Sequence, residues 1–379
     1  MEAATSRRPR STAAGVRART AASAVGLIAL LSGCFGSTGT AEPTPSSAAH
    51  SVHHLRVVHV DSDYTLDPTT SWFADALAQR SGGLLEANFA FDCCGDGPDI
   101  EQQAIHDVAS GAVDLGWVGV RALHKAGTSA FDPLIAPMVI GSYQGMKDAL
   151  ADEDVTRGML ASLEPVGVTG LGVVPGSIRF PLSTGVTLTD PARWAGLPFY
   201  SFESVVGTQS LAALGVTAQN LGFGDRDEAF EAGRLKAQDN SLLYQSTHTE
   251  QVQQAVVNVP LWARISVVIA SPQLALSDEE KAWIAGAVAD TVARTPELAD
   301  LDRDAVEMGC RASSVFVTST AAQLAEFRQR FAPVVDAIGR ETGNEQALER
   351  VRSAAGQGAV EDGSLGCAGT GTPSSTHGG

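Results

Sequence analysis

Short apolar runs alternate with segments of helical periodicity along most of this 379-residue chain. Compact apolar runs bounded by turn residues are typical of buried strands, and an apolar residue every three to four positions is typical of helices. Their alternation predicts an α/β fold with mainly parallel sheets. The Ser and Glu of a capping box, at Ser277 and Glu280, predict the start of one helix. The predicted strands are 55–60, 113–118 and 168–174, and the predicted helices include 72–77, 100–108 and one beginning at 278.

The N-terminal segment has the pattern of a targeting signal. Arginines precede an apolar stretch at 21–31, which is shorter than the ~20 residues that a membrane-spanning helix needs. The stretch ends in Leu-Ser-Gly-Cys34, which resembles the lipobox of bacterial lipoproteins. We therefore expect 1–33 to be removed, Cys34 to be lipidated and 34–53 to form a flexible tether. A plain secretory signal followed by a chance cysteine is the alternative.

The charge balance excludes one class of partner. The chain has 26 Lys and Arg against 43 Asp and Glu, a formal net charge of −17. The first 33 residues hold five arginines and one glutamate, a net charge of +4, so the remainder carries −21. A surface this acidic repels DNA and RNA, and nucleic-acid binding is not expected. A negatively charged ligand would need a local positive group to hold it against this field.

The remaining cysteines are expected to form stabilising disulfides outside the cytoplasm. Cys93, Cys94, Cys310 and Cys367 allow three pairings, and a bond between the adjacent Cys93 and Cys94 is not expected because it would be strained. The spacing Cys-x-x-Cys is absent, as are the nucleophile elbow, the P-loop and His-Glu-x-x-His. We therefore expect neither an enzyme nor a metal or cofactor.

Several segments resemble, in order, the dicarboxylate-type solute-binding proteins of tripartite ATP-independent (TRAP) transporters. The resemblance covers about 55–338, and each segment alone is short. The segments are 55–61 followed by Trp72-Phe73-Ala74, 108–115 with Gly111 and Asp114, 131–140, 176–182 with Arg179, Asp190 leading to Gly196-Leu197, and 230–240 ending in Asn240.

The resemblance implies two α/β lobes joined by crossing strands, with a hinge and a ligand cleft between the lobes. The implied function is an extracytoplasmic receptor, anchored to the cell membrane through Cys34, that captures a small organic solute, in most of the family an acid. It would deliver the solute to a membrane permease. An orphan sensor or scavenger and an ABC-type binding lipoprotein are the alternatives. The implied regions are 54–175 with 262–300 for lobe I, 176–261 with 301–345 for lobe II, and a disordered tail at 356–379.

Five residues are candidates for contact with the solute. By the resemblance, Arg179 would bind a carboxylate and Asn240 would orient the ligand. A guanidinium matches a carboxylate with two parallel hydrogen bonds. Asp61 lies in the loop after the first predicted strand, and Trp117 lies in the second; Trp117 either walls the cleft or packs in the core. The fifth candidate, Tyr200, is a departure from the family.

Tyr200 stands where the family has its principal carboxylate-binding arginine, three positions after Leu197. A tyrosine can donate one hydrogen bond but carries no positive charge. Either another arginine replaces the missing one, with Arg193 and Arg226 as candidates, or the solute is less acidic or more apolar than in most of the family.

Overall fold

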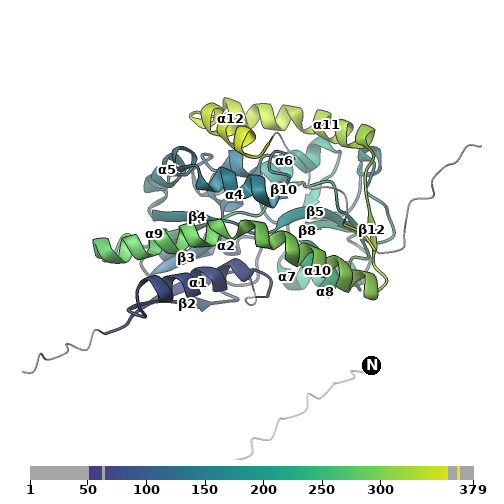
Figure 1. The fold of residues 1–379 in the computed structure, drawn as a ribbon. Helices are drawn as coiled ribbons and strands as arrows, with labels where there is room; N and C mark the ends of the chain where they lie inside the picture. Colours follow the sequence, from purple (N-terminus) through teal and green to yellow (C-terminus); the bar gives the residue numbers. More distant parts are fainter. Residues whose placement is uncertain (1–50, 62–64, 357–364, 368–379) are drawn as a thin grey trace, which may run out of the picture. The chain divides into compact units, whose positions relative to one another are not determined.

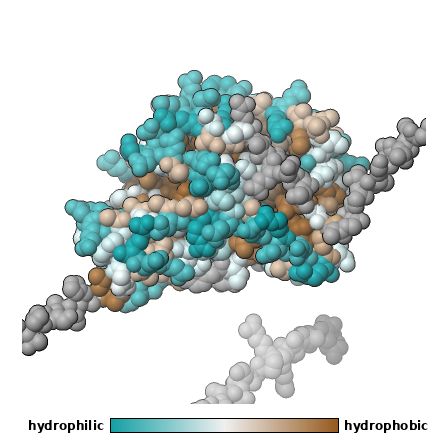
Figure 2. All heavy atoms as spheres, viewed as in Figure 1, coloured by the Kyte–Doolittle hydropathy of each residue, from teal (hydrophilic) through white to brown (hydrophobic). Residues whose placement is uncertain are grey.

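The computed structural model describes residues 51–61, 65–356 and 365–367, and they form two sheets covered by helices (Figure 1). Cys34, the export segment and most of the expected tether lie outside the described residues, as does most of the predicted disordered tail. Within the described residues, no helix is long and apolar enough to cross a membrane. The face in Figure 2 carries many hydrophilic residues with apolar ones between them, as at the surface of most folded proteins.

The first sheet has the strand order β2-β1-β3-β11-β4. Strand β1 pairs in parallel with β2 and β3, whereas β11 runs antiparallel to both of its neighbours. Helices α1, α2 and α9 pack against this sheet. The bounds are β1 His53–His59, α1 Pro68–Arg80, β2 Leu85–Ala90, α2 Ile100–Ala109, β3 Leu115–Gly119, β4 Thr169–Val174, β11 Ser266–Ala270 and α9 Asp278–Ala293.

The second sheet has the order β12-β9-β5-β8-β6-β7, and β10 pairs with β5 beside this path. Helices α6, α8 and α10 pack against its strands. The bounds are β5 Ile178–Ser183, β6 Phe199–Tyr200, α6 Val205–Ala213, β7 Ala218–Gln219, α7 Phe223–Glu231, β8 Ala237–Asn240, α8 Leu242–Thr247, β9 Gln254–Val256, β10 Trp262–Ala263, α10 Leu298–Arg311 and β12 Val315–Val317.

The remaining helices lie between and over these layers. Helix α11 packs against α6 and α12, and α12 also contacts α4 and α5. Their bounds are α3 Leu123–Ala126, α4 Tyr143–Ala151, α5 Glu153–Ala161, α11 Ala321–Arg340 and α12 Asn344–Ala354, with 3-10 turns η1 Val120–Ala122, η2 Asp132–Ile135, η3 Glu164–Val166, η4 Pro191–Arg193 and η5 Thr295–Glu297.

Most of the local predictions are confirmed, but the expectation of mainly parallel sheets is wrong. The predicted strands correspond to β1, β3 and β4, and the capping box at Ser277 and Glu280 opens α9. Both sheets are mixed, with antiparallel pairs on either side of β5 and of β11. The antiparallel pairs of the first sheet arise because β4 leads directly into the second sheet and β11 brings the chain directly back beside it, in the opposite direction.

Two of the chain's passages between the two sheets lie next to each other. The chain passes from β4 to β5 through 175–177 and returns from β10 to β11 through 264–265. The two crossings lie side by side, since the Arg264 amide donates to the Ser177 carbonyl over 2.8 Å. A Cβ atom on Gly176 would lie 2.6 Å from the Arg264 carbonyl oxygen, so this approach requires glycine. The lobe boundaries given above stay a prediction.

Two disulfides join the four described cysteines. Cys310 in α10 pairs with Cys367, 57 residues further along the chain. Cys93 pairs with its neighbour Cys94, contrary to the expectation that adjacent cysteines would not bond. The backbone accommodates this pair in a loop where Cys94 has a left-handed φ of 75°, an uncommon conformation for a residue other than glycine. The spacing of the cysteines in the sequence does not predict this backbone conformation.

Candidate functional site

A cleft lies where the two sheets meet at the crossings. It consists of two adjoining cavities of about 600 and about 770 Å³, which share the lining residues Asp61, Arg179, Phe202 and Arg264. These residues come from the loop after β1, from β5, from the segment after β6 and from the second crossing. Ligand sites in α/β proteins are expected at such junctions, beyond the ends of strands.

Arg179 is a buried cation of this cleft that forms no ion pair among the described residues, although the buried Asp239 carboxyl acts on it electrostatically. It lies on β5 opposite Trp262 of β10, and its side chain is only 7% exposed. One guanidinium nitrogen donates to the Asn240 side-chain oxygen, and the guanidinium carbon lies 5.3 Å from the Phe202 ring centre. Burial, assisted by the positive charge of Arg264, lowers the pKa of Arg179 to about 10. It therefore stays charged at neutral pH.

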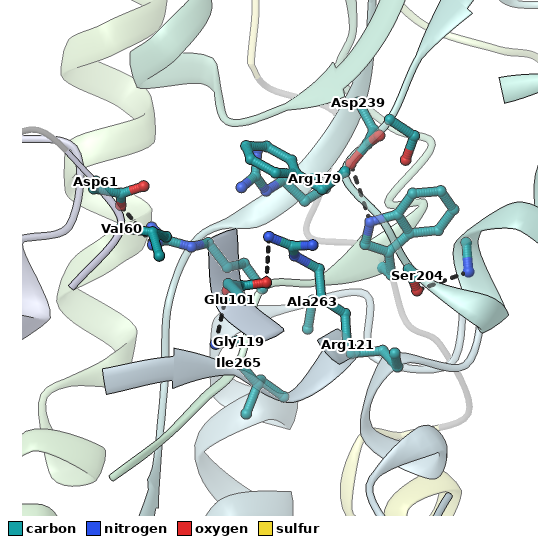
Figure 3. A pocket seen from close by; sticks show the side chains of 16 residues that line it. Val60, Asp61, Glu101, Gly119, Arg121, Arg179, Ser204, Asp239, Ala263 and Ile265 are labelled. Atoms are coloured by element: carbon teal, nitrogen blue, oxygen red, sulfur yellow. Dashed lines mark hydrogen bonds and ion pairs between the residues drawn. The ribbon is translucent and has the colours of Figure 1, made fainter. Parts of the chain in front are cut away.

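The other arginines that line the cleft are already paired within the described part of the chain. In each pair a guanidinium nitrogen lies close to a carboxylate oxygen: 2.5 Å for Arg264 and Asp61, 2.5 Å for Arg121 and Glu101, and 2.7 Å for Arg226 and Asp227. Figure 3 shows the Arg121–Glu101 pair and the Asp61 contact as dashed lines around Arg179. Among the described arginines that line the cleft, Arg179 is thus the one without an ion pair.

An ion cluster holds the hinge side of the cleft. Arg264 contacts Asp61 and also Asp67, at 3.3 Å, and the His59 ring lies 3.5 Å from Asp67. Burial alone would raise the pKa of both carboxyl groups, but Arg264 and His59 outweigh it, and both pKa values fall below their ordinary range. The donor atoms of His59, Asp61 and Asp67 lie close enough together to hold a cation. The guanidinium of Arg264 already supplies the positive charge there.

Hydrogen bonds and ion pairs bridge the cleft at its rim. Arg121, which follows β3, donates to the Glu203 carbonyl oxygen over 2.8 Å, and Lys125 pairs with the Glu203 carboxylate at 2.6 Å. Glu203 follows β6 of the other sheet. The Gly119 amide donates to the Glu101 carboxylate beside this bridge over 3.0 Å. These contacts hold the two layers together around the cavity.

Three of the five sequence-predicted site residues line the cleft. Arg179, Asn240 and Asp61 do so, and Arg179 and Asn240 contact one another. Tyr200 is buried on β6 and lines only a small neighbouring cavity; burial raises its pKa to about 12. Trp117 packs in the core against Phe73 and Phe89 and donates to Asp67, so its role is to support the ion cluster from behind.

Of the two arginines considered as replacements, the structure brings one to the cleft. Arg193 is exposed on η4, whereas Arg226 on α7 is buried and lines the larger cavity. The Arg226 guanidinium lies 5.6 Å from the Tyr200 ring centre and 5.4 Å from that of Tyr244. A cation is thus present beside Tyr200, although it comes from a helix rather than from the strand.

Sequence reasoning missed Arg264, the residue on which the hinge cluster depends. A signal was present, because Arg264 is the only charged residue in the apolar run 259–270. A lone arginine in such a run is expected to be buried and paired. The pattern does not say which carboxylates pair with it, since Asp61 and Asp67 lie about 200 positions earlier in the chain.

A protein-family comparison identifies the chain. Residues 59–342 match the family described as bacterial extracellular solute-binding protein, family 7. The chain belongs to this family. The resemblance to TRAP solute-binding proteins is thereby confirmed, and the family binds solutes rather than catalysing reactions. No match was found among curated protein sequences.

Solved structures share the two-lobed fold of this solute-binding protein at low sequence identity. The sugar acid binding protein of Advenella mimigardefordensis, in complex with galactonate, is 18% identical with a TM-score of 0.69, covering 82% of this chain and 99% of that one. A TRAP periplasmic solute-binding protein from Bordetella bronchispeptica, with density described as pantoate, is 17% identical with a TM-score of 0.68, covering 79% and 99%. One from Desulfovibrio salexigens, with bound orotic acid, is 17% identical with a TM-score of 0.68, covering 81% and 99%.

The hinge cluster generates a stability prediction. In Arg264→Gln, two buried carboxylates lose their cation, and we expect the free energy of unfolding at pH 7 to fall by about 3–5 kcal/mol. Without the guanidinium, burial raises the pKa of both carboxyl groups. As the pH falls, the two groups take up protons, and the cost of burying their unpaired charges disappears. The difference in the free energy of unfolding between Arg264→Gln and the unmodified protein should therefore be smaller at pH 5 than at pH 7, as measured by urea unfolding. The exposed Arg193→Gln is the control, and an equally large loss in both variants would contradict the prediction.

Proposed function

We propose that this protein is an extracytoplasmic receptor that captures a small organic acid between its lobes for a TRAP-type membrane permease. The observation that carries the proposal is Arg179, a buried guanidinium whose hydrogen bond goes to the neutral Asn240 and which has no ion pair among the described residues. The nearby Asp239 and Asp61 carboxyl groups act on this guanidinium without forming an ion pair with it, and a ligand carboxylate within hydrogen-bonding distance would compensate the buried charge directly. The acids named for the similar structures, galactonate, pantoate and orotic acid, support the same ligand class.

The proposed binding reaction uses the geometry around Arg179. The carboxylate would receive hydrogen bonds from the guanidinium, and Asn240, whose oxygen already accepts from Arg179 and from the Ser241 amide, would offer its NH₂ group. Closure through Arg121, Lys125 and Glu203 would exclude water and strengthen the ion pair. The acidic surface keeps anions from binding elsewhere, so affinity would be confined to this cleft.

Removal of the Arg179 charge tests this function. We expect Arg179→Ala to weaken binding of an organic acid by about 2–5 kcal/mol, which is about 30-fold or more, because the acid loses its counter-charge in a desolvated site. Arg179→Lys should retain part of the affinity, since it keeps the charge without the paired hydrogen bonds. Calorimetry with the acids found by a thermal-shift screen measures both, with Arg193→Ala as the control. Unchanged affinity in Arg179→Ala would rule out the assigned site.

The membrane attachment is tested separately. The proposal includes lipidation of Cys34, so Cys34→Ala should incorporate no labelled palmitate and should move from the membrane fraction to the soluble fraction. Cys310→Ala is the control, because that cysteine takes part in a disulfide within the folded domain. If Cys34→Ala stayed in the membrane fraction and still carried label, the anchor would have to be elsewhere.

A further inference from the structure

Aromatic side chains form the wall of the cleft beyond Arg179. Phe202, Phe223, Tyr244 and His248 all line the larger cavity, and they come from the segment after β6, from the start of α7 and from α8 with its C-cap. Phe202 and Phe223 meet edge to face with ring centres 5.8 Å apart, and Tyr244 and His248 stack at 3.9 Å. Such a wall offers ring faces and edges to whatever lies against it.

The hydrogen-bonding groups of this wall are largely engaged within the protein. The Tyr244 hydroxyl donates to Gln251 over 2.7 Å, and the Ser241 hydroxyl accepts from the Tyr244 amide over 3.1 Å. His248 Nδ1 lies 3.1 Å from the Tyr244 carbonyl oxygen. Hydroxyl groups of a ligand that lie against these aromatic side chains would lose water without gaining a partner there, at about 1–3 kcal/mol for each group left unpaired.

The position of Phe202 relates the aromatic wall to the carboxylate site. Its ring centre lies 5.3 Å from the Arg179 guanidinium carbon and 4.4 Å from that of Arg121. A carboxylate paired with Arg179 therefore lies beside an aromatic face. On the far side, Arg226 lies over the Phe223 ring at 5.2 Å while paired with Asp227, so it extends the flat surface without adding a second free charge.

We propose that the solute is an aromatic carboxylate, with its carboxylate on Arg179 and its planar ring against Phe202, Phe223 and Tyr244. The proposal rests on the function above and narrows the ligand class. Arg179, which has no ion pair among the described residues, favours a carboxylate, and the ring faces favour a flat unsaturated body over a polyhydroxylated chain. Because Tyr200 replaces the family's principal carboxylate-binding arginine, the carboxylate in this proposal is held by Arg179 instead.

Matched acids test the ligand class. Benzoate and 4-hydroxybenzoate are compared by calorimetry with cyclohexanecarboxylate, which has the same charge and a similar size without an aromatic ring, and with galactonate and pantoate. We expect benzoate to bind about 3- to 10-fold more tightly than cyclohexanecarboxylate. Phe223→Leu should weaken the binding of benzoate by a similar factor. Phe316→Leu on β12, away from the cleft, should leave the affinity for benzoate unchanged.

The outcomes separate this inference from the proposed function. If galactonate, pantoate or cyclohexanecarboxylate bound more tightly than benzoate, the aromatic ligand class would be wrong. If that binding were also lost in Arg179→Ala, the protein would still be a receptor for an organic acid. If none of these acids bound, the aromatic inference would be wrong; the wider screen of organic acids would then decide the proposed function. An aromatic preference that Phe223→Leu did not change would also overturn the assignment of the ring to this wall.

A different observation concerns how α7 is held. The helix begins after Gly222, which has no side chain to cap it, and its first two amides, Phe223 and Gly224, lie 2.9 and 3.4 Å from an Asp96 side-chain oxygen. Asp96 belongs to the loop 91–99 after β2 of the first sheet, whereas α7 belongs with the second. Asp96 thus caps a helix of the opposite lobe.

Two features make this contact specific. A Cβ atom on Gly222 would lie 1.9 Å from the Asp96 carbonyl oxygen, so only glycine allows the two backbones to approach. The loop is held on its other side by the Asp92 amide, which donates to the Asp61 carbonyl over 2.9 Å, and by the disulfide between Cys93 and Cys94. A bond between adjacent cysteines closes a small ring and removes freedom from the backbone that leads to Asp96.

We infer that loop 91–99 is a latch between the lobes and that the Cys93–Cys94 bond positions Asp96 for it. The latch matters for binding because α7 carries Phe223 and Arg226 into the cleft. A loop without the bond would sample more conformations, and the cap on α7 would form less often.

Hydrogen exchange of the Phe223 and Gly224 amides tests the latch without a ligand. In Cys93→Ser/Cys94→Ser, Asp96 is unchanged, and we expect both amides to exchange about 3- to 10-fold faster. Gly222→Ala should have the same effect and should increase the radius of gyration in X-ray scattering. Cys310→Ser, which breaks the other disulfide, is the control and should leave these amides unchanged. Unchanged exchange in the double serine variant would overturn the role of the Cys93–Cys94 bond, and unchanged exchange in Gly222→Ala would overturn the latch.

Discussion

The fold depends on one buried cation, Arg264, where the chain returns from one sheet to the other. Its guanidinium holds Asp61 and Asp67, and Asp67 in turn caps α1 by accepting from the Thr69 amide. Charges in a low-dielectric interior must be paired closely, so this cluster fixes the crossing, the loop after β1 and the start of α1 relative to one another. The hinge side of the cleft is therefore set by electrostatics as much as by apolar packing.

The same requirement explains the selectivity expected of the cleft. Three of its lining arginines are neutralised by carboxylates that lie beside them, and Arg179 is held by an amide oxygen instead. A neutral partner orients the guanidinium without cancelling its charge. Arg179 thus stays a cation without a direct ion pair, among the described residues, in a molecule of net charge −17.

Local features were predictable from the sequence, and long-range ones were not. Strands β1, β3 and β4 and the start of α9 at Ser277 follow from periodicity and capping, which act over a few residues. The direction of β11 depends on where the chain crosses between sheets, and no local pattern records that. Arg179 and Asn240 were found through the family resemblance, whereas Arg264 was missed because its partners lie far away in the chain.

The exchange of an arginine for Tyr200 has a mechanical consequence. A cation on β6 would be fixed by the sheet, as Arg179 is fixed by β5. Arg226 instead approaches Tyr200 from α7, whose first turn is capped by Asp96 of the other lobe. The position of this second guanidinium therefore depends on contact between the lobes, while that of Arg179 does not.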